Sequence, residues 1–531
     1  MDVVLARYRI PGTLVDVERR AADLALEQTV EIPEALVQQV GLKAHQVGQI
    51  RQILPLETSE QLFEVEIAFP ADFASGGLGQ LSNLLFGNIS LKPELRLTAV
   101  ELPPCVLSQY QGPRFGVPGL RQLLGIQGRP LLATALKPRG VPVALLANWA
   151  REFALGGGDL IKDDHNLVEP HFEAFLQRVN TCQAAIHEAE QTLGRAVPYL
   201  PNLAGPADQM PRRIEACLKL GVTGFLVAPF LVGLDTLTSW TATYPAFWLA
   251  HPTFAGGHLH SPQHGMEASW LLGTLFRLAG CDGTIFPNSG GRFSFTPQTC
   301  QEISAAARNP LGHFPAIWPS PAGGMSYDRL PMMAEQYGAD ALFLIGGALL
   351  NDPAGLQAAT RRYRDSLGQL FPDAQEVPPE GFSSACEWRP RSRGTNRESN
   401  GLATDHLRFL EGFQWKGRSR TAYKETADLP FKGVERTELI GQFGEQADFD
   451  LRYFEIGPSG HSSLEKHVHT HVIIGARGQG HLRIEGETRT IRPFDIAYVP
   501  PLQVHQLLNE NAEPFGFFCI VDRQRDKPQP P

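Results

Sequence analysis

The pattern of hydrophobic and polar positions changes along this chain of 531 residues. Between about residues 129 and 370, eight short apolar runs alternate with longer segments whose apolar residues recur every three to four positions. Short apolar runs are typical of buried strands, and the longer segments are typical of amphipathic helices. The alternation predicts a (β/α)8 barrel of the TIM type. An open, doubly wound sheet would show the same alternation, so the count of eight runs favours the barrel.

The segments on either side of the predicted barrel have different patterns. Residues 1–128 mix strand-like and helical runs, which predicts a separate α+β domain. The barrel domain is expected to extend over residues 129–385. Residues 386–405 are polar and basic, as in a linker. In residues 406–531, alternation of apolar and polar positions with turn signals predicts a small all-β barrel or sandwich.

Composition narrows the class of protein. A net charge of −9 gives no electrostatic reason to expect nucleic acid or an anionic membrane as a partner. The seven cysteines are scattered without CxxC spacing, which predicts reduced thiols rather than disulfides or a thiolate metal site. The N-terminal residues show no signal-peptide pattern, and no apolar run is long enough to span a bilayer. We therefore expect a cytoplasmic protein.

Reactive side chains follow several of the predicted barrel strands. Lys137 comes after the first strand, His251 after the fifth, and Lys162, Asp164 and His165 after the second. Because the carboxyl ends of the strands form the functional face of such a barrel, we expect these residues around one cavity.

Paired glycines end the last two predicted strands. Gly323 and Gly324 follow the seventh strand, and Gly346 and Gly347 follow the eighth. Bare backbone N–H groups at these positions predict a phosphate cradle. Arg292, after the sixth strand, is the candidate cation to complete it. A tight turn or a helix start is the alternative for each pair, but two pairs at consecutive strand ends favour phosphate.

Histidines cluster in one predicted strand of the C-terminal segment. Glu465, His467, His469 and His471 occupy alternate positions, so on a strand all four would face one side. His505 follows in a later apolar run. Several imidazoles and one carboxylate inside a small β-barrel would suit Mn²⁺ or another transition metal. A histidine-rich exposed strand is the alternative.

The combined motifs of residues 1–370 resemble those of the RuBisCO superfamily, and specifically the RuBisCO-like proteins, which do not fix carbon dioxide. The signature of this family after the second strand is G-G-x-D-x-x-K-D-D-E. It is matched within "GGGDLIKDDH", residues 156–165, where His165 stands in place of the glutamate. Glu27 and Asn88 stand where the family has catalytic residues of the N-terminal domain.

The resemblance implies cofactors and partners. In the family the signature lysine is carbamylated and binds Mg²⁺, which assigns Lys162, Asp164 and His165 as ligands here. Imidazole suits magnesium poorly, so an uncarbamylated or metal-free site is the alternative. The family also builds its site across a homodimer or a larger homo-oligomer, in which Glu27 and Asn88 would act on the barrel of the partner subunit.

Departures from the family argue against carboxylation. Arg139 replaces a second lysine after the first strand, the mobile-loop lysine is absent near Arg292, and the H-R-A motif reads HPT at residues 251–253. The arginine of that motif grips a second phosphate, so its loss implies a monophosphate substrate with a less polar distal end. Lys137, as general acid or base, and His251 remain candidates for proton transfer beside a carbonyl.

The C-terminal segment resembles a cupin domain. Its clustered histidines precede "GARGQG", and a second motif ends at His505 and Asn509. His471 occupies the position where many cupins have glutamate, which leaves the choice of ligands among the clustered residues open.

Fusion of an enolising sugar-phosphate barrel to a metal cupin predicts consecutive steps on one small molecule. By the resemblance, the barrel isomerises 5-methylthioribulose 1-phosphate to 1-methylthioxylulose 5-phosphate in methionine salvage. The cupin is then a methylsulfurylase that releases methanethiol and leaves 1-deoxyxylulose 5-phosphate. The alternatives are a decarboxylase or transcarboxylase of branched 3-oxo acid phosphates, a 2,3-diketo-5-methylthiopentyl-1-phosphate enolase, and a cupin that only binds a ligand or oligomerises.

Overall fold

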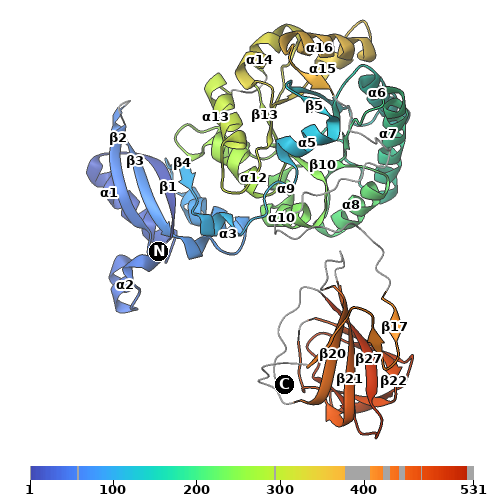
Figure 1. Cartoon of the computed structure of the whole chain (residues 1–531). Helices are drawn as coiled ribbons and strands as arrows, with labels where there is room; N and C mark the ends of the chain where they lie inside the picture. The colour runs from blue at the N-terminus through green and yellow to red at the C-terminus, as the bar shows by residue number, and fades with distance from the viewer. Residues whose placement is uncertain are drawn as a thin grey trace. The chain divides into compact units, whose positions relative to one another are not determined.

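The computed structural model of the protein describes residues 2–56, 59–291, 293, 295–376, 407–422, 431–441, 449–467 and 469–522. The chain divides into two compact units, Met1–Arg393 and Gly394–Pro531 (Figure 1). The predicted linker at residues 386–405 lies outside the described residues, and so does the candidate phosphate ligand Arg292.

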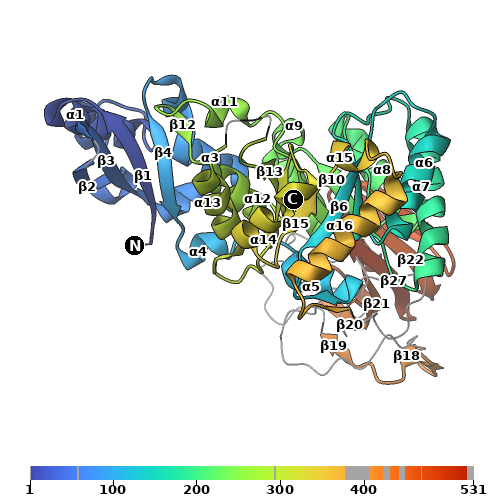
Figure 2. The same cartoon turned by 90° about the horizontal axis from the view of Figure 1, so that it is seen from above.

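An antiparallel sheet with helices forms the N-terminal part of the first unit, as predicted. Its strands are β1 (Val3–Pro11), β2 (Gln49–Leu56), β3 (Ser59–Pro70) and β4 (Arg96–Glu101), and its helices are α1 (Leu14–Glu27), α2 (Glu34–Gln39), α3 (Leu78–Phe86), α4 (Pro104–Leu107) and α5 (Gly116–Leu124). Every second residue of β1, from Val4 to Ile10, is fully buried, because successive side chains of a strand point to opposite faces. A short strand from the barrel region, β12 (Gly265–Met266), pairs with β4 at the edge of this sheet (Figure 2).

A parallel barrel follows, with eight strand positions in the predicted order. The strands are β6 (Leu131–Leu136), β7 (Leu160–Asp163), β8 and β9 (Tyr199–Leu200 and Asn202–Leu203), β10 (Gly224–Val227), β11 (Phe247–Ala250), β13 (Gly283–Pro287), β14 (Trp318–Ala322) and β15 (Leu342–Leu344). The sheet begins at β8 and ends at β9, which only Pro201 separates, so the two edges meet in one chain segment and nearly close the barrel. The predicted (β/α)8 barrel is confirmed.

Helices surround the barrel strands (Figure 1). They are α6 (Val143–Leu155), α7 (Phe172–Leu193), α8 (Met210–Lys219), α9 (Pro229–Val232), α10 (Leu234–Thr243), α11 (Gly256–Leu259), a π-helix (Ser269–Thr274) that continues into α12 (Leu275–Leu278), α13 (Pro297–Arg308), α14 (Leu330–Tyr337), α15 (Gly347–Leu350) and α16 (Leu356–Leu370). In α6, Leu146, Ala150 and Phe153 are buried at helical spacing. A small antiparallel pair, β5 (Ile126–Gln127) and β16 (Gln375–Glu376), joins the two ends of the barrel segment.

The second unit is an antiparallel β-barrel of the cupin type, as predicted. Its strands are β17 (Phe409–Leu410), β18 (Gln414–Trp415), β19 (Arg420–Ala422), β20 (Lys432–Ile440), β21 (Phe449–His461), β22 (His471–Arg477), β23 (Gly480–Ile484), β24 (Glu487–Ile491), β25 (Ile496–Val499), β26 (His505–Asn509) and β27 (Phe515–Asp522). Alternate residues such as Ile456, Ile473 and Phe517 fill its interior. Within the described part of the whole chain, none of the helices has the length and apolar character needed to cross a membrane.

Candidate functional site

A cavity of about 610 Å³ lies at the carboxyl ends of the barrel strands. The predicted site residues that line it are Lys137, Lys162, Asp164, His165, His251, Gly323, Gly324, Gly346 and Gly347. They lie at or just after the ends of strands β6, β7, β11, β14 and β15, which are far apart in sequence but end at the same rim of the barrel. The barrel topology therefore gathers these residues, whose individual roles stay predictions.

The segment at the end of β7 divides its side chains between the cavity and the barrel wall. Asp163 is fully buried and accepts a hydrogen bond of 2.7 Å from Arg178 of α7. Lys162 and Asp164, its neighbours on either side, line the cavity. Successive side chains of a strand point to opposite sides, so this alternation follows from the strand itself. Asp163 thus stabilises the wall, and its two neighbours are available for chemistry.

Lys162 is almost completely buried, with 3% of its surface exposed. Burial lowers the pKa of its amine to about 8, although the carboxylates of Asp164 and Asp163 act in the opposite direction. The charge of Lys137 lowers it further. At pH 7 about a tenth of Lys162 is therefore uncharged, far more than for a lysine of ordinary pKa. An uncharged amine is the form that reacts with carbon dioxide.

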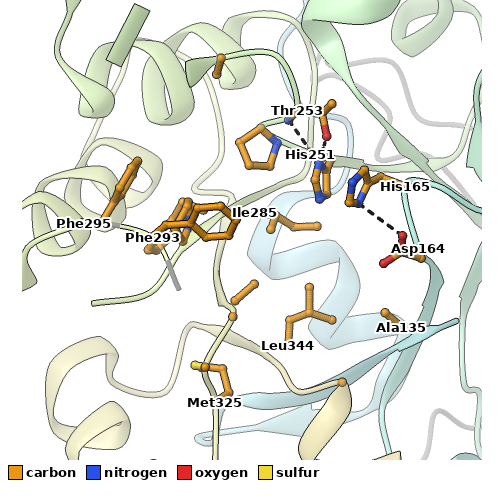
Figure 3. Close-up of a pocket in the computed structure, with 18 of the residues that line it drawn as sticks. Ala135, Asp164, His165, His251, Thr253, Ile285, Phe293, Phe295, Met325 and Leu344 are labelled. Atoms are coloured by element: carbon orange, nitrogen blue, oxygen red, sulfur yellow. Dashed lines mark hydrogen bonds and ion pairs between the residues drawn. The ribbon is translucent and has the colours of Figure 1, made fainter. Parts of the chain in front are cut away.

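Two imidazoles face each other in the cavity (Figure 3). The rings of His165 and His251 stack with their centroids 4.2 Å apart. His165 Nδ1 lies 3.5 Å from an oxygen of Asp164, and His251 Nδ1 lies 2.5 Å from the hydroxyl of Thr253. Sequence reasoning did not identify Thr253 as a partner, although it belongs to the HPT triplet already singled out.

Both imidazoles are uncharged near neutral pH. Burial is the main cause of the lowered pKa of His165 and of the strongly lowered pKa of His251. The charge of Lys162 lowers both further, while Asp164 partly offsets the effect at His165. An uncharged imidazole can accept a proton, so either ring has the ionisation state of a general base.

The three predicted barrel ligands fit magnesium only conditionally. Mg²⁺ prefers oxygen donors, and Asp164 is the only oxygen donor among these three side chains. His165 offers nitrogen, and its Nε2 lies 3.2 Å from Asn166 Nδ2. A carbamate on Lys162 would replace an amine with two oxygen donors. The set therefore suits magnesium when Lys162 is carbamylated and does not suit it otherwise.

The two glycine pairs line the cavity, and the space around the individual glycines differs. A Cβ atom on Gly346 would lie 3.1 Å from Nζ of Lys137, whereas one on Gly347 would meet no atom within 4 Å. Gly323 and Gly324 have positive φ angles of 85° and 66°, which side chains with a Cβ rarely adopt. Gly346 thus leaves room for the lysine, and Gly347 leaves open space in the cavity.

An arginine that sequence reasoning missed connects two of the loops at this rim. Arg329 donates hydrogen bonds to the carbonyl oxygens of Ser289, at 2.5 Å, and Gly324, at 3.1 Å. These carbonyls follow β13 and β14, respectively. Arg329 therefore fixes one glycine pair relative to the loop that begins after β13.

Apolar side chains cover another part of the cavity. Leu259, Ile285, Phe293, Phe295 and Met325 line it, and the two phenylalanines are drawn apart from the histidine pair in Figure 3. Apolar side chains at this place suit an uncharged, apolar part of a ligand. Sequence reasoning did not single out the phenylalanines, because isolated aromatic residues in a loop carry no distinguishing pattern.

Glu27 and Asn88 lie together in the N-terminal domain. Asn88 Nδ2 donates a hydrogen bond of 2.5 Å to a carboxylate oxygen of Glu27, which ends α1. Neither residue is among those that line the barrel cavity of this chain. Their pairing brings the two predicted N-terminal residues into one place, outside the cavity.

The second unit brings the predicted cupin residues together in its interior. The potential ligand atoms of His467, His469 and His471 lie within 4.8 Å of one another, and so do those of Glu465, His467 and His505. Among the described residues, these are the groups of three or more histidine, cysteine or acidic side chains with such spacing. The strand predicted over Glu465–His471 is wrong, because β22 begins only at His471 and Glu465 forms an isolated bridge with His505. The cluster therefore results from the segment before β22 meeting the start of β26, and not from the alternation of side chains along one strand.

Hydrogen bonds orient the imidazoles of this cluster. His467 Nδ1 donates to the backbone carbonyl of His469 at 2.7 Å, and His505 Nδ1 donates to that of Gln503 at 2.9 Å. The Nε2 atoms of these two rings then carry the lone pairs that a metal needs. His467 Nε2 is buried without a hydrogen-bond partner. An orphaned buried acceptor among further imidazoles fits a metal ion well.

The charge state of the cluster agrees with this fit. Burial lowers the pKa of His467 to about 4 and lowers those of His471 and His505 as well. Uncharged imidazole is the form that binds metals. Glu465 adds a carboxylate, which accepts a hydrogen bond of 2.5 Å from Ser463. The mixed nitrogen and oxygen donors suit a transition metal such as Mn²⁺.

Comparison with known families agrees with the fold of the two units. Residues 116–382 match the catalytic domain of the ribulose bisphosphate carboxylase large chain, and residues 452–521 match the cupin domain. The chain therefore belongs to the RuBisCO family, as a RuBisCO-like protein with a C-terminal cupin domain. The two resemblances inferred from the motifs are confirmed.

Individual relatives are also similar. The chain is 41% identical to 5-methylthioribulose-1-phosphate isomerase of Rhodospirillum rubrum, over 66% of this chain and 92% of that protein. It is 30% identical to 2,3-diketo-5-methylthiopentyl-1-phosphate enolase of Geobacillus kaustophilus, over 70% of this chain and 93% of that protein. A Rubisco-like protein from Rhodopseudomonas palustris superposes with a TM-score of 0.62 at 36% identity, over 70% and 98% of the two chains.

Proposed function

We propose that the protein is a bifunctional sugar-phosphate enzyme and not a carboxylase. Its barrel isomerises 5-methylthioribulose 1-phosphate to 1-methylthioxylulose 5-phosphate. Its cupin domain then acts as a methylsulfurylase that releases methanethiol and leaves 1-deoxyxylulose 5-phosphate. The isomerase relative from Rhodospirillum rubrum, at 41% identity, supports the first step.

The arrangement of the barrel cavity is the observation that carries the first step. Glycine-ended strands β14 and β15 offer space and backbone N–H groups for one phosphate. Lys137 and the two uncharged imidazoles line the same cavity and would flank the carbonyl of the bound substrate. The apolar part of the cavity, with Phe293 and Phe295, suits a methylthio end. The three parts match a monophosphate with a thioether at its far end.

The isomerisation moves a carbonyl along the sugar chain by proton transfer alone. A base removes a proton from the carbon beside the carbonyl, and an enediolate forms. The proton then returns to the former carbonyl carbon, so that the carbonyl has moved by one position. A second cycle moves it once more, which places it beside the methylthio-bearing carbon without any oxidant or reductant.

The chain's own residues can supply these transfers. His251, held by Thr253, is our candidate for the base, and Lys137 is the candidate that donates a proton to the oxygen of the enediolate. His165 is held between the first ring and Asp164, where it would keep His251 in place and share its proton. Arg292 and the glycine pairs would bind the phosphate.

Magnesium and the partner subunit would complete the site. With Lys162 carbamylated, Lys162, Asp164 and His165 would hold Mg²⁺, which when bound supplies positive charge for an enediolate. We also propose a homodimer or larger homo-oligomer in which Glu27 and Asn88 act on the barrel of a second subunit. The pairing of these two residues outside their own chain's cavity supports that arrangement.

The cupin step has a definite chemical balance. Replacing the carbon–sulfur bond by a carbon–hydrogen bond, with release of methanethiol, consumes two electrons and two protons. A pair of small-molecule thiols can supply both and leave as a disulfide. Glu465, His467, His469, His471 and His505 would hold the metal, whose binding would polarise the carbonyl of the substrate.

Proton NMR of the full-length protein in deuterated buffer tests both steps. With 5-methylthioribulose 1-phosphate and Mg²⁺, we expect deuterium in the sugar backbone and signals of 1-methylthioxylulose 5-phosphate. Addition of Mn²⁺ and a thiol reductant should then release methanethiol. The variant His467→Ala should still isomerise the substrate but release no methanethiol. Absence of both exchange and product, in protein of verified metal content, would rule out the isomerase.

Similarity to the enolase of Geobacillus kaustophilus supports a second candidate reaction. An enolase of 2,3-diketo-5-methylthiopentyl 1-phosphate would use the same base and the same phosphate cradle. The same NMR assay with that substrate distinguishes the two, because only the enolase would convert it. Carbon dioxide release from branched 3-oxo acid phosphates tests the decarboxylase alternative in the same way.

A further inference from the structure

A buried arginine lies in the interior of the cupin barrel. Arg452 on β21 is only 7% exposed. It is in phase with Phe454 and Ile456, which belong to the interior core, while Tyr453 faces a separate cluster on the outer side. The guanidinium group is therefore directed into the barrel rather than to solvent.

The arginine and the histidine cluster share this interior. Strand β27 lies between β21 and β22, and its Cys519 pairs with Arg452 on one side and with Ile473 on the other. His471 precedes Ile473 by two positions and thus faces the same way. Two strand spacings, roughly 10 Å, separate the backbones of β21 and β22. A small ligand can contact both the cluster and the arginine.

Two of the guanidinium nitrogens of Arg452 lack a strong acceptor. Its Nη2 contacts the sulfur of Cys519 at 3.6 Å, and sulfur is a weak acceptor. Its Nε is buried without a hydrogen-bond partner, and its Cζ lies 5.2 Å from the ring centre of Phe454. Asp450, a buried carboxylate, stands two residues earlier on the same face. A buried cation with unused donors is costly unless a ligand supplies acceptors.

We propose that Arg452 binds an oxyanion of the ligand that occupies the cupin interior. A planar guanidinium matches a phosphate or carboxylate with two parallel hydrogen bonds. Under the proposed function, on which this assignment of the ligand rests, the oxyanion is the phosphate monoester of the barrel product. The remaining part of the ligand then reaches the histidine cluster, so Arg452 sets which end of the molecule faces the metal.

Equilibrium dialysis of the full-length protein with radiolabelled inorganic phosphate tests the anion site without requiring turnover. Arg452→Met is the main variant, because Met keeps the apolar stem of the side chain and removes the charged end with its hydrogen-bond donors. Cys519→Ser is the matched control, since it alters the thiol contact and keeps the cation. Binding in the barrel cavity contributes equally to all three proteins, so it cancels in the comparison.

We expect Arg452→Met to weaken or remove one class of phosphate sites, with a rise of about tenfold or more in its dissociation constant. Cys519→Ser should bind as the wild type does. Identical phosphate binding by wild type and Arg452→Met would overturn the proposal. If that variant does not fold, Arg452→Gln gives the same comparison. Displacement of the bound radiolabelled phosphate is then compared for two competitors, xylulose 5-phosphate and acetate. Stronger displacement by the first indicates a phosphate ligand, and stronger displacement by the second indicates a carboxylate ligand.

A second experiment tests whether the anion binds beside the histidine cluster. It records the visible absorption of the protein loaded with cobalt(II) in place of the native metal. Phosphate should change the cobalt spectrum of the wild type, and about tenfold more phosphate should be needed in Arg452→Met. An unchanged requirement would show that the anion binds the metal without the arginine and would overturn the proposal. Failure of methanethiol release with a normal phosphate response would count against the methylsulfurylase and not against the anion site.

Discussion

The imidazole of His165 stacks on that of His251 at a centroid distance of 4.2 Å and an angle of 22°. His165 stands where the family signature has a glutamate. The exchange therefore removes an oxygen donor and adds an imidazole that packs against the ring of His251. Asp164 and His251 hold the ring of His165 in place. The exchange therefore gives the cavity a second imidazole where the family signature has a carboxylate.

Replacement of His251 should abolish most of the isomerase activity. His251→Gln removes an uncharged imidazole of lowered pKa that is oriented by Thr253. Loss of a general base typically costs two to four orders of magnitude in rate, so we expect kcat to fall by about 10²–10⁴. Deuterium exchange into the substrate measures the effect. His187→Asn, on the exposed side of α7, is the control, and equal activity of His251→Gln and wild type would exclude this base.

Restoring the family's oxygen donor should strengthen magnesium binding. His165→Glu would place a carboxylate beside Asp164 and next to Lys162, whose lowered pKa of about 8 favours carbamate formation. We expect the magnesium concentration needed for carbamylation to fall by about tenfold. The carbamate signal in carbon-13 NMR with labelled bicarbonate measures this. Lys162→Met should show no signal, and a signal of that variant equal to wild type would place the carbamate elsewhere.

The two glycines after β15 should respond differently to alanine. Gly346→Ala places a methyl group 3.1 Å from the amine of Lys137, so the lysine must move and kcat should fall about tenfold or more. Gly347→Ala meets no protein atom within 4 Å and should leave kcat and stability nearly unchanged. A rise in KM for Gly347→Ala would indicate that the phosphate occupies the space beside it. Steady-state kinetics separate these cases, and equal losses of kcat would contradict the assignment.

Substitution of the two consecutive aspartates after Lys162 should have different effects, one on stability and the other on activity. Asp163→Asn removes one of the two carboxylates that pair with the buried guanidinium of Arg178, the other being Glu169, and should lower the free energy of unfolding by about 1–3 kcal/mol. Asp164→Asn lines the cavity and should lower activity with little effect on stability. Urea unfolding and the isomerase assay on both variants measure this. The opposite pattern would show that our division of the two side chains is wrong.

The metal-free cupin domain should lose stability as the pH falls. Because the pKa of folded His467 is lowered from 6.5 to about 4, the unfolded chain binds a proton between these values and the folded chain does not. Stability present above pH 6.5 is therefore lost toward pH 4, by about 1–3 kcal/mol. Thermal unfolding between pH 7 and pH 4.5 measures it. His467→Asn should flatten the dependence, and an unchanged slope would place the titration elsewhere.

Much of the fold was predictable because its signals are local. Strand and helix periodicity in residues 129–370 gave the barrel, and alternation in residues 406–531 gave the cupin barrel. Family motifs were equally local and identified both domains. The placement of cavity residues at strand ends followed from a general property of parallel barrels.

Individual roles were harder to predict because they depend on neighbours far away in sequence. The family signature selects Asp164 for the cavity, but the sequence does not show that its neighbour Asp163 pairs with Arg178 of α7 in the barrel wall. Arg329 and the phenylalanines of the cavity likewise have no local signature. Their positions result from loops that meet across the barrel rim.

The sequence by itself determined the class of each domain, the family and the residue types available for chemistry, because periodicity and motifs survive in one dimension. Only the tertiary structure decided which side chains face one another. It stacked His165 on His251, and it directed the lone pair of His467 inward. It also placed Arg452 among apolar neighbours inside the cupin barrel. Burial and orientation decide charge and hydrogen bonding, and both arise only when distant segments pack together.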